Sequence, residues 1–273
     1  MNEKEVFMNG IKDVEMKSNW IRHVDTKFNI LHILRSKKDL YKLLDNIEQY
    51  YKDMLITPPG PIDEKQSDDG EEFDKNHYGR YSQDFTGWHI KHAGGVINRV
   101  QCTSVLDVGC GMGSMVRGFL KNNVDIRGID ISNYSIDNCN KEIHKLVSHA
   151  DIRKVDTLPK IKFDLVTCYN VLEHVSDPDI AIYNISNLTD KWIHTTVRDI
   201  RCLYPEDIQI FDPTLITGRS IKWWIGEFEK EGFDLVFDID YTWLIFEPRF
   251  ALMVTGCPVF QALFRKREGN EAV

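Results

Sequence analysis

Near the N-terminus, apolar residues recur at helical spacing. From Leu40 to Leu55 they lie mostly three or four positions apart, which is typical of an amphipathic helix. Ser36, followed three residues later by Asp39, resembles a capping box at the start of this helix. The pattern predicts a helix whose apolar side packs on the rest of the protein, with a dimer face or a substrate lid as alternatives.

The composition changes between residues 58 and 76. This segment opens with Pro58, Pro59, Gly60 and Pro61 and continues into an acidic run over residues 63–74, a composition typical of a solvated connection. The sequence therefore predicts four parts: an N-terminal helical extension (1–57), an acidic Pro/Gly linker (58–76), a main domain (77–260) and a C-terminal tail (261–273).

Beyond the linker, helical and strand patterns alternate, which indicates an α/β domain with a mostly parallel sheet covered on both faces. In the first helix, Trp88, Val96 and Ile97 are expected to point inward. The expected helices span residues 86–100, 114–120, 135–145 and 220–231. The expected strands span residues 104–108, 126–131, 146–150, 163–168, 192–197, 233–239 and 250–255.

The first of these strands leads directly into a turn that contains Gly109, Gly111 and Gly113. Glycine permits positive φ and lets the backbone approach a ligand closely. Asp130 follows about twenty residues later, at the end of the next strand, where a carboxylate is placed to accept both hydroxyls of a ribose. The turn and the acid together predict a nucleoside site.

The neighbours of the turn distinguish between two classes of nucleoside ligand. A dinucleotide-binding turn would have glycine at position 114, but Ser114 is present, and Asp107 would add negative charge near a pyrophosphate. A sulfonium or ammonium group is instead attracted by a nearby carboxylate. The turn therefore favours a cationic nucleoside over a nicotinamide dinucleotide.

The segment from Asp107 to Gly113 resembles the first motif of class I S-adenosylmethionine-dependent methyltransferases, and further segments between residues 88 and 256 match in the family's order. Residues 150–152 resemble the element whose acid meets the adenine amino group, and residues 164–175 resemble the motif that lines the methionine moiety. The resemblance implies a Rossmann-like, seven-stranded, mostly parallel sheet and S-adenosyl-L-methionine as the cofactor. It implies cofactor contacts from Asp107, Gly109, Cys110, Gly111, Gly113, Asp130, Ile131, Asp151, Ile152, Tyr169 and Asn170.

Methyl transfer requires mainly the alignment of nucleophile, methyl and sulfur, so a general base is useful rather than obligatory. By resemblance His174 faces the pocket and is the candidate base, with a pocket-wall histidine as the alternative. Tyr78, Tyr81 and Glu173 are expected to contact the substrate or to form a lid.

Two further motifs match known patterns incompletely. Glu173 and His174 suggest a metal site, but Asn170 stands where a further Glu would be needed, so we expect no metal. Residues 212–215 resemble an Asp-x-Thr-His segment of methyltransferases that act on sugars and other metabolites, but Leu215 replaces the histidine. A role for this segment as a base is therefore not predicted.

The charge and the cysteines refine the expected partners and location. The chain carries 34 Lys and Arg against 42 Asp and Glu, a formal charge of −8, of which −5 belongs to residues 58–76. The expectation that nucleic acid is not a partner therefore depends on missing motifs: no Asn-Pro-Pro-Tyr or Asp-Pro-Pro-Tyr follows the strand over residues 163–168, and no Lys/Arg-rich tract interleaved with aromatic residues is present apart from the short basic run 265–267. No apolar stretch approaches a membrane span and no signal sequence is evident, so a cytoplasmic location is expected. The six scattered cysteines are interpreted as small buried hydrophobes or free thiols.

We therefore expect an S-adenosylmethionine-dependent methyltransferase that moves a methyl group to an oxygen or nitrogen of a small metabolite or saccharide by in-line displacement. The alternatives are a methyltransferase of nucleic acid or protein, a non-catalytic binding protein with the same fold, and a nicotinamide oxidoreductase. A homodimer through the N-terminal helices is a further hypothesis. The sequence does not identify the acceptor, because acceptor specificity lies in variable loops.

Overall fold

The computed structural model describes residues 36–53, 69–78, 86–199, 212–237, 243–247 and 257–268. Eight strands form one sheet in the order β3-β2-β1-β4-β5-β8-β6, with β7 also paired to β8. The strands are β1 (Ser104–Val108), β2 (Asp125–Asp130), β3 (Val147–His149), β4 (Phe163–Tyr169), β5 (Thr189–Arg198), β6 (Phe233–Val236), β7 (Trp243–Glu247) and β8 (Cys257–Lys266).

The sheet has seven strand positions because two short strands share one edge of β8. β6 pairs with residues 263–266 of β8 and β7 with residues 257–261, both antiparallel. The strands from β1 to β5 pair in parallel, whereas β8 runs antiparallel to β5. The expectation of a Rossmann-like, mostly parallel sheet with seven strand positions is therefore confirmed.

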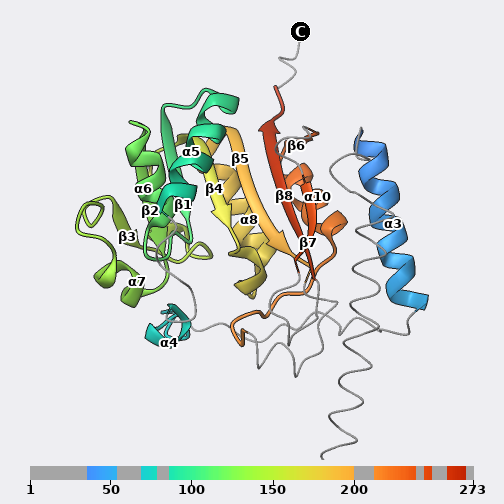
Figure 1. The fold of residues 1–273 in the computed structure, drawn as a ribbon, viewed down its shortest axis with the longest axis horizontal. Coiled ribbons are helices and arrows are strands. Elements are labelled where there is room, and N and C mark those ends of the chain that lie inside the picture. The colour runs from blue at the N-terminus through green and yellow to red at the C-terminus, as the bar shows by residue number, and fades with distance from the viewer. Residues whose placement is uncertain are drawn as a thin grey trace, which may run out of the picture.

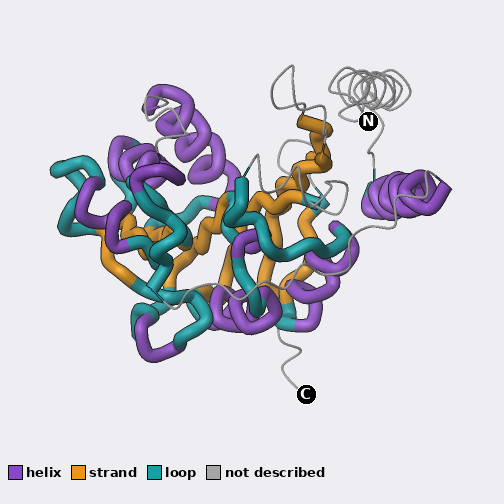
Figure 2. The backbone as a smooth tube through the Cα atoms, turned by 90° about the horizontal axis from the view of Figure 1, so that it is seen from below, coloured by secondary structure: helices purple, strands orange, loops and turns teal. Residues whose placement is uncertain are grey.

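Helices cover both faces of the sheet (Figure 2). One hydrophobic core joins the sheet to α5 and α6, and a second joins it to α8, α10 and α3. The helices are α3 (Lys37–Asp53), α4 (Lys75–Tyr78), α5 (Thr86–Val100), α6 (Ser114–Lys121), α7 (Asn133–Asn138), α8 (Pro178–Asn187) and α10 (Ile221–Lys230), with 3₁₀ turns η1 (Val155–Thr157) and η2 (Leu172–His174). In the part of the chain that is described, no helix is long and apolar enough to cross a membrane.

The N-terminal helix α3 lies beside α10, although the two are far apart in sequence (Figure 1). Ser36 Oγ accepts the Asp39 N–H at 3.2 Å and donates to the Asp39 carboxylate at 2.8 Å, so the capping box is confirmed. Leu40, Leu43 and Leu44 are buried in the same core as the α10 residue Trp224. The apolar face of α3 therefore packs on the rest of the chain, as the helical pattern predicts.

Two helical expectations were wrong in detail. Trp88 does not point inward but is 58% exposed, whereas Val96 on the same helix is buried. The helix expected over residues 135–145 ends at Asn138, and the chain continues as a turn. The Asn140 side chain accepts the Glu142 N–H at 2.9 Å, a local hydrogen bond that competes with helix formation.

The C-terminal boundary also differs from the expectation. β8 extends to Lys266, so residues 261–266 belong to the sheet and not to a tail. β8 lies inside the sheet, with both faces buried, and such strands read as nearly continuous apolar runs without alternation. The strand expected over residues 250–255 lies outside the described residues.

Candidate functional site

The glycine turn follows β1 and is held against the end of β2. The amides of Gly109 and Cys110 both donate to the carbonyl of Ile129, at 2.8 and 3.0 Å. Gly109, Gly111 and Gly113 all have positive φ, between 52° and 81°. At Gly109 a Cβ atom would also lie 2.2 Å from a methyl of Val171. Both the backbone conformation and the close approach of Val171 therefore require glycine at this position.

Asp130 ends β2 beside this turn. Its carboxylate accepts the Gly111 N–H at 2.7 Å and the Ser132 N–H at 2.8 Å. Burial raises the pKa of Asp130, and these two backbone hydrogen bonds oppose that rise. The Ser135 side chain is a further hydrogen-bond partner of this carboxylate, so a ligand hydroxyl would share the two oxygens with Ser135.

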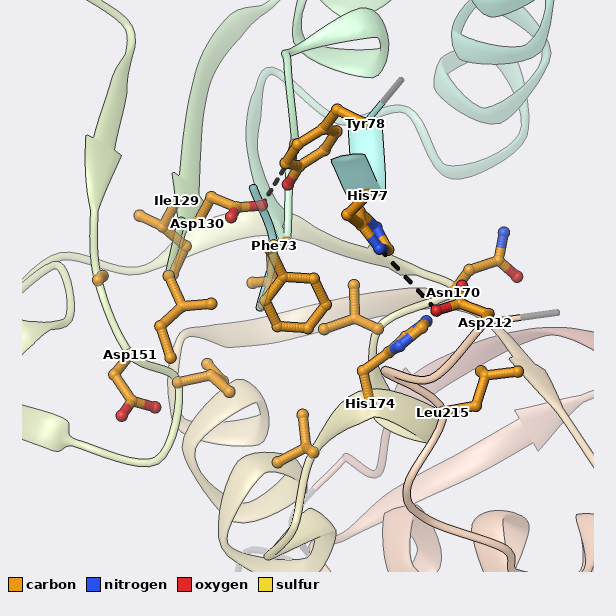
Figure 3. A pocket seen from close by; sticks show the side chains of 18 of the residues that line it. Phe73, His77, Tyr78, Ile129, Asp130, Asp151, Asn170, His174, Asp212 and Leu215 are labelled. Atoms are coloured by element: carbon orange, nitrogen blue, oxygen red, sulfur yellow. Dashed lines mark hydrogen bonds and ion pairs between the residues drawn. The ribbon is translucent and has the colours of Figure 1, made fainter. Parts of the chain in front are cut away.

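A cavity of about 270 Å³ opens between the turn, the ends of β2 and β4, and residues 69–78 (Figure 3). Its walls combine apolar side chains with a few polar groups, as ligand pockets commonly do. Of the residues expected from the sequence, it brings together Tyr78, Gly109, Gly111, Asp130, Ile131, Asp151, Ile152, Asn170 and His174.

Asp151 contributes to this cavity differently from the expectation. The Arg153 guanidinium binds both of its carboxylate oxygens, at 2.9 and 2.8 Å. Although burial by itself raises the pKa of Asp151, these hydrogen bonds and the positive charge hold that pKa below its usual value. The carboxylate is therefore ionised and already paired with Arg153. An adenine amino group would have to donate its hydrogen bond to an oxygen that also accepts one from Arg153.

Asp107 lies in the middle of the sheet, one strand away from Asp130. It accepts a hydrogen bond from Thr167 Oγ1 at 2.6 Å. Burial raises the pKa of Asp107 to about 7, and the hydrogen bond from Thr167 limits that rise. Asp107 is therefore a carboxyl group that is easily ionised by a nearby positive charge.

A second cavity of about 410 Å³ lies on the α5 side of the turn and includes Asp107, Cys110 and Tyr169 among its walls. It shares Gly109, Asn170 and Arg198 with the first cavity, so the two adjoin along the glycine turn. His92 on α5 lines it, and burial lowers the pKa of this ring to about 4, so the His92 side chain is uncharged at neutral pH.

His174 is partly buried at the end of η2. Its Nδ1 atom lies 2.9 Å from the carbonyl oxygen of Thr214. Because a carbonyl only accepts, the neutral ring carries its proton on Nδ1. Burial lowers the pKa of His174 to about 4, so the ring is neutral near pH 7 and is a weaker base than an ordinary histidine.

Glu173 does not line either cavity but holds the neighbouring loop. Its backbone carbonyl accepts the amides of Ile216 and Thr217 at 3.1 and 3.0 Å. Its buried carboxylate lies 3.7 Å from the guanidinium of Arg198. Glu173 therefore positions both Arg198 and residues 212–217 rather than contacting a ligand directly.

The end of the acidic segment packs on the site instead of forming a solvated connection. Phe73 is buried, and its carbonyl accepts the Ser132 hydroxyl hydrogen bond at 2.6 Å. The Tyr78 ring lies over Gly111, 3.3 Å from where a Cβ would be. Residues 69–78 therefore form a wall of the first cavity, to which Phe73 and Tyr78 contribute aromatic rings. The many acidic residues of this segment led to the expectation of a solvated connection, although these two aromatic side chains are available for packing.

The remaining expected residues lie elsewhere. Gly113 sets the start of α6 and its absent Cβ makes room for Ile143. Tyr81 lies outside the described residues. Cys102, Cys110, Cys139 and Cys168 are buried free thiols, as predicted.

Ten residues that line the first cavity were not predicted as site residues. Six are aliphatic, and the four with aromatic, polar or charged side chains are Phe73, His77, Arg198 and Asp212. Asp212 lies in the segment 212–215 that the sequence singles out, and His77 precedes the expected site residue Tyr78, but nothing in a single sequence indicates that residues 135 positions apart meet. For Phe73 the sequence does contain a signal, because an aromatic residue within the acidic run 63–74 indicates a position that packs against the protein.

Comparisons with known proteins agree with this geometry. Residues 106–191 match the family described as a methyltransferase domain. The chain is 35% identical over 88 residues to a ubiquinone biosynthesis O-methyltransferase of Coxiella burnetii, which covers 31% of this chain and 38% of the relative. It is 29% identical over 89 residues to the enzyme of the same name from Alkalilimnicola ehrlichii, covering 31% and 36%. The chain thus matches less than two-fifths of the length of these relatives.

Solved structures show the same fold over more of the chain. The YcgJ protein of Bacillus subtilis superposes with a TM-score of 0.52 at 15% identity, covering 66% of this chain and 100% of that one. Magnesium protoporphyrin IX methyltransferase of Synechocystis, solved with S-adenosylhomocysteine, superposes with a TM-score of 0.50 at 15% identity, covering 71% and 92%. Residues 106–191 therefore match a methyltransferase domain, and the fold that carries the glycine turn and the strand-end acid is similar to that of these solved structures.

Proposed function

We propose that this protein transfers the methyl group of S-adenosylmethionine to a hydroxyl oxygen of a small molecule. The observation that carries the proposal is the first cavity, where a turn of three positive-φ glycines faces the Asp130 carboxylate at the ends of adjacent parallel strands. Ligands of open α/β sheets bind at this edge.

The chemistry of the cavity fits a cationic nucleoside. The Asp130 carboxylate would accept hydrogen bonds from the two ribose hydroxyls. The apolar side chains of Ile131, Ile152 and Val171 would contact the adenine ring. When bound, S-adenosylmethionine supplies a methyl group that its positive sulfur makes electrophilic.

Asp107 supports the choice of a cationic ligand. A carboxyl whose pKa is about 7 is only partly ionised at neutral pH, and a positive charge nearby stabilises its ionised form. We propose that Asp107, which borders the second cavity, is ionised when the α-ammonium group of the ligand lies close to it. A pyrophosphate would instead be repelled by both Asp107 and Asp130.

The size and walls of the cavities favour a small acceptor. Among the described residues, Phe73, His77 and Tyr78 line the first cavity on one side and Asp212 and Leu215 on another, and a volume of about 270 Å³ suits a small molecule. The relatives named for O-methyl transfer support oxygen as the methylated atom. Within this class we propose a hydroxylated metabolite or saccharide, and we propose the cytoplasm as its location, consistent with four free buried cysteines.

Calorimetric titration with S-adenosylhomocysteine and with NAD tests the cofactor. We expect micromolar binding of S-adenosylhomocysteine and no measurable binding of NAD. The acceptor is then sought by incubating the protein and S-adenosylmethionine with cell metabolites and recording a 14-dalton increase by mass spectrometry, a mass that corresponds to one methyl replacing one hydrogen. Binding without any methylated product would favour a non-catalytic binding protein, and absence of S-adenosylhomocysteine binding would overturn the proposal.

A further inference from the structure

Polar side chains from three distant segments meet on one wall of the first cavity. His77 comes from α4, His174 from η2 and Asp212 from the loop before α10. Thr214, from the same loop, does not line the cavity but contacts both Asp212 and His174. Figure 3 shows His77 and Asp212 joined across the cavity wall, with His174 beside them. The His77 and His174 ring centroids are 6.3 Å apart, so the four residues form one cluster.

Hydrogen bonds hold the Asp212 side of this cluster in place. The Asp212 carboxylate accepts the Thr214 hydroxyl hydrogen bond at 2.6 Å and the Thr214 N–H at 3.1 Å. Thr214 Oγ1 in turn lies 2.9 Å from the protonated Nδ1 of His174. Asp212 is thus a buried carboxylate with a defined orientation. His174 contacts Thr214, the residue that orients this carboxylate.

His77 is the imidazole that the carboxylate can activate. Its Nδ1 atom lies 3.9 Å from Asp212 Oδ1, and the two side chains are 11% and 4% exposed. A buried carboxylate at this distance stabilises a positive imidazolium ring. Asp212 also acts on His174, but burial outweighs that charge and lowers the pKa of His174 to about 4, so His174 is a weak proton acceptor.

We propose that His77 is the general base of methyl transfer and that Asp212 is the residue that positions it; this inference rests on the proposed function. The acceptor hydroxyl loses its proton to Nε2 of His77, while its oxygen forms the new bond to the methyl carbon. The electron pair of the broken carbon–sulfur bond stays on sulfur. The imidazolium formed on His77 is stabilised by Asp212 and releases its proton to solvent afterwards.

The adjacent sequence agrees with this division of roles. Leu215 lines the same cavity but carries no titratable group, so residues 212–215 supply a carboxylate and a hydroxyl without a base of their own. α4 supplies the imidazole from across the cavity. The other titratable or charged groups around His77 are Asp74, which accepts the His77 N–H at 3.1 Å, together with Tyr78, His174 and Arg198.

The test compares His77→Asn with His144→Asn, which changes an exposed histidine outside both cavities. With catechol as the acceptor probe and S-adenosylhomocysteine release as the signal, we expect His77→Asn to lower kcat by about 10²- to 10⁴-fold. KM for the probe and the dissociation constant for S-adenosylhomocysteine should change less than about 3-fold, because the base is not needed for ground-state binding. Added imidazole should partly restore kcat, and His144→Asn should behave as wild type.

A second measurement does not depend on turnover. The titration of the His77 ring is followed by NMR in the S-adenosylhomocysteine complex of wild type and of Asp212→Asn. We expect the midpoint to move to lower pH in Asp212→Asn, because the imidazolium loses its counter-charge. An unchanged midpoint, or a kcat in His77→Asn equal to wild type, would overturn the proposal. If S-adenosylhomocysteine still binds in that case, the proposed function survives and only the assignment of the base fails.

Discussion

At the scale of single residues, Asp107 and Asp130 are buried acids on adjacent strands with different surroundings. Asp130 accepts two backbone N–H groups at the edge of a cavity, whereas Asp107 accepts one hydroxyl in the interior of the sheet. Two hydrogen bonds orient Asp130 for a ligand, and the weaker support of Asp107 leaves its pKa near neutrality, at about 7. The same residue type therefore has two separate physical roles.

Replacement of Asp130 by Asn tests its role in ribose binding. The substitution keeps the shape but removes the charge and one acceptor oxygen, so we expect S-adenosylhomocysteine to bind about 1–3 kcal/mol more weakly. Isothermal titration calorimetry measures this change. Asp125→Asn, on the exposed start of the same strand, should leave the affinity unchanged. Equal affinities for both variants would exclude Asp130 as the ribose ligand.

Asp107 makes stability depend on pH. Its pKa in the folded protein, about 7, is above its ordinary value of 3.8. The stability that the protonated form contributes is therefore complete below pH 3.8 and is lost as the pH rises to about 7. Asp107→Asn is neutral throughout, so its Tm relative to wild type should increase between pH 5 and pH 8, by about 3 °C or more. Calorimetric scans at both pH values provide the check, and a difference that does not vary with pH would refute the burial of an ionisable Asp107.

At the scale of elements, the helix α3, near the start of the described chain, packs against α10. Leu40 is fully buried between them, and Lys37 and Lys222 form ion pairs with Glu229 and Asp45 across the contact. Because exposed ion pairs contribute little, the buried leucines supply most of the contact free energy. The apolar face of α3 is therefore buried against other residues of the same chain.

Leu40→Ala measures this contact. Removal of the side chain from a packed core should lower the free energy of unfolding by about 2–5 kcal/mol, whereas Lys38→Ala, at an exposed position of the same helix, should change it by less than about 0.5 kcal/mol. Urea denaturation gives both values. Light scattering on the same samples should show one unchanged mass; a mass that halves in Leu40→Ala would instead place this face in a homodimer.

At the scale of the whole molecule, β8 joins the parallel strands to the edge strands β6 and β7. It pairs with β5 on one side and with β6 and β7 on the other, so the C-terminal segment connects the strands that follow residue 232 to the site-bearing strands. The stability of the domain therefore depends on residues that follow most of the sheet in sequence.

Two truncations test this dependence. A chain ended after Phe260 loses six residues of β8, including the buried Leu263 and Phe264, and should not fold cooperatively, as judged by circular dichroism on heating. A chain ended after Glu268 keeps the whole strand and should unfold at the wild-type Tm. A folded domain in the shorter chain would show that β8 is dispensable.

The sequence predicts the part of the candidate site around the glycine turn and Asp130. The elements that carry it are local: a strand, a glycine turn and an acid at the end of the next strand all lie within about 25 residues, and periodicity and turn chemistry act at that range. The strand over residues 104–108 has the expected bounds. The end of the domain was misplaced because a strand buried on both faces lacks the alternation that marks a strand.

What the sequence by itself determined is the α/β class, the glycine turn and the family resemblance, because these depend on the order and spacing of neighbouring residues. Only the tertiary structure decided the pairing of His77 with Asp212, the turning of Asp151 toward Arg153 and the pKa values of Asp107 and His174. These properties depend on desolvation and on contacts between segments up to 135 residues apart, and no local pattern records either of them.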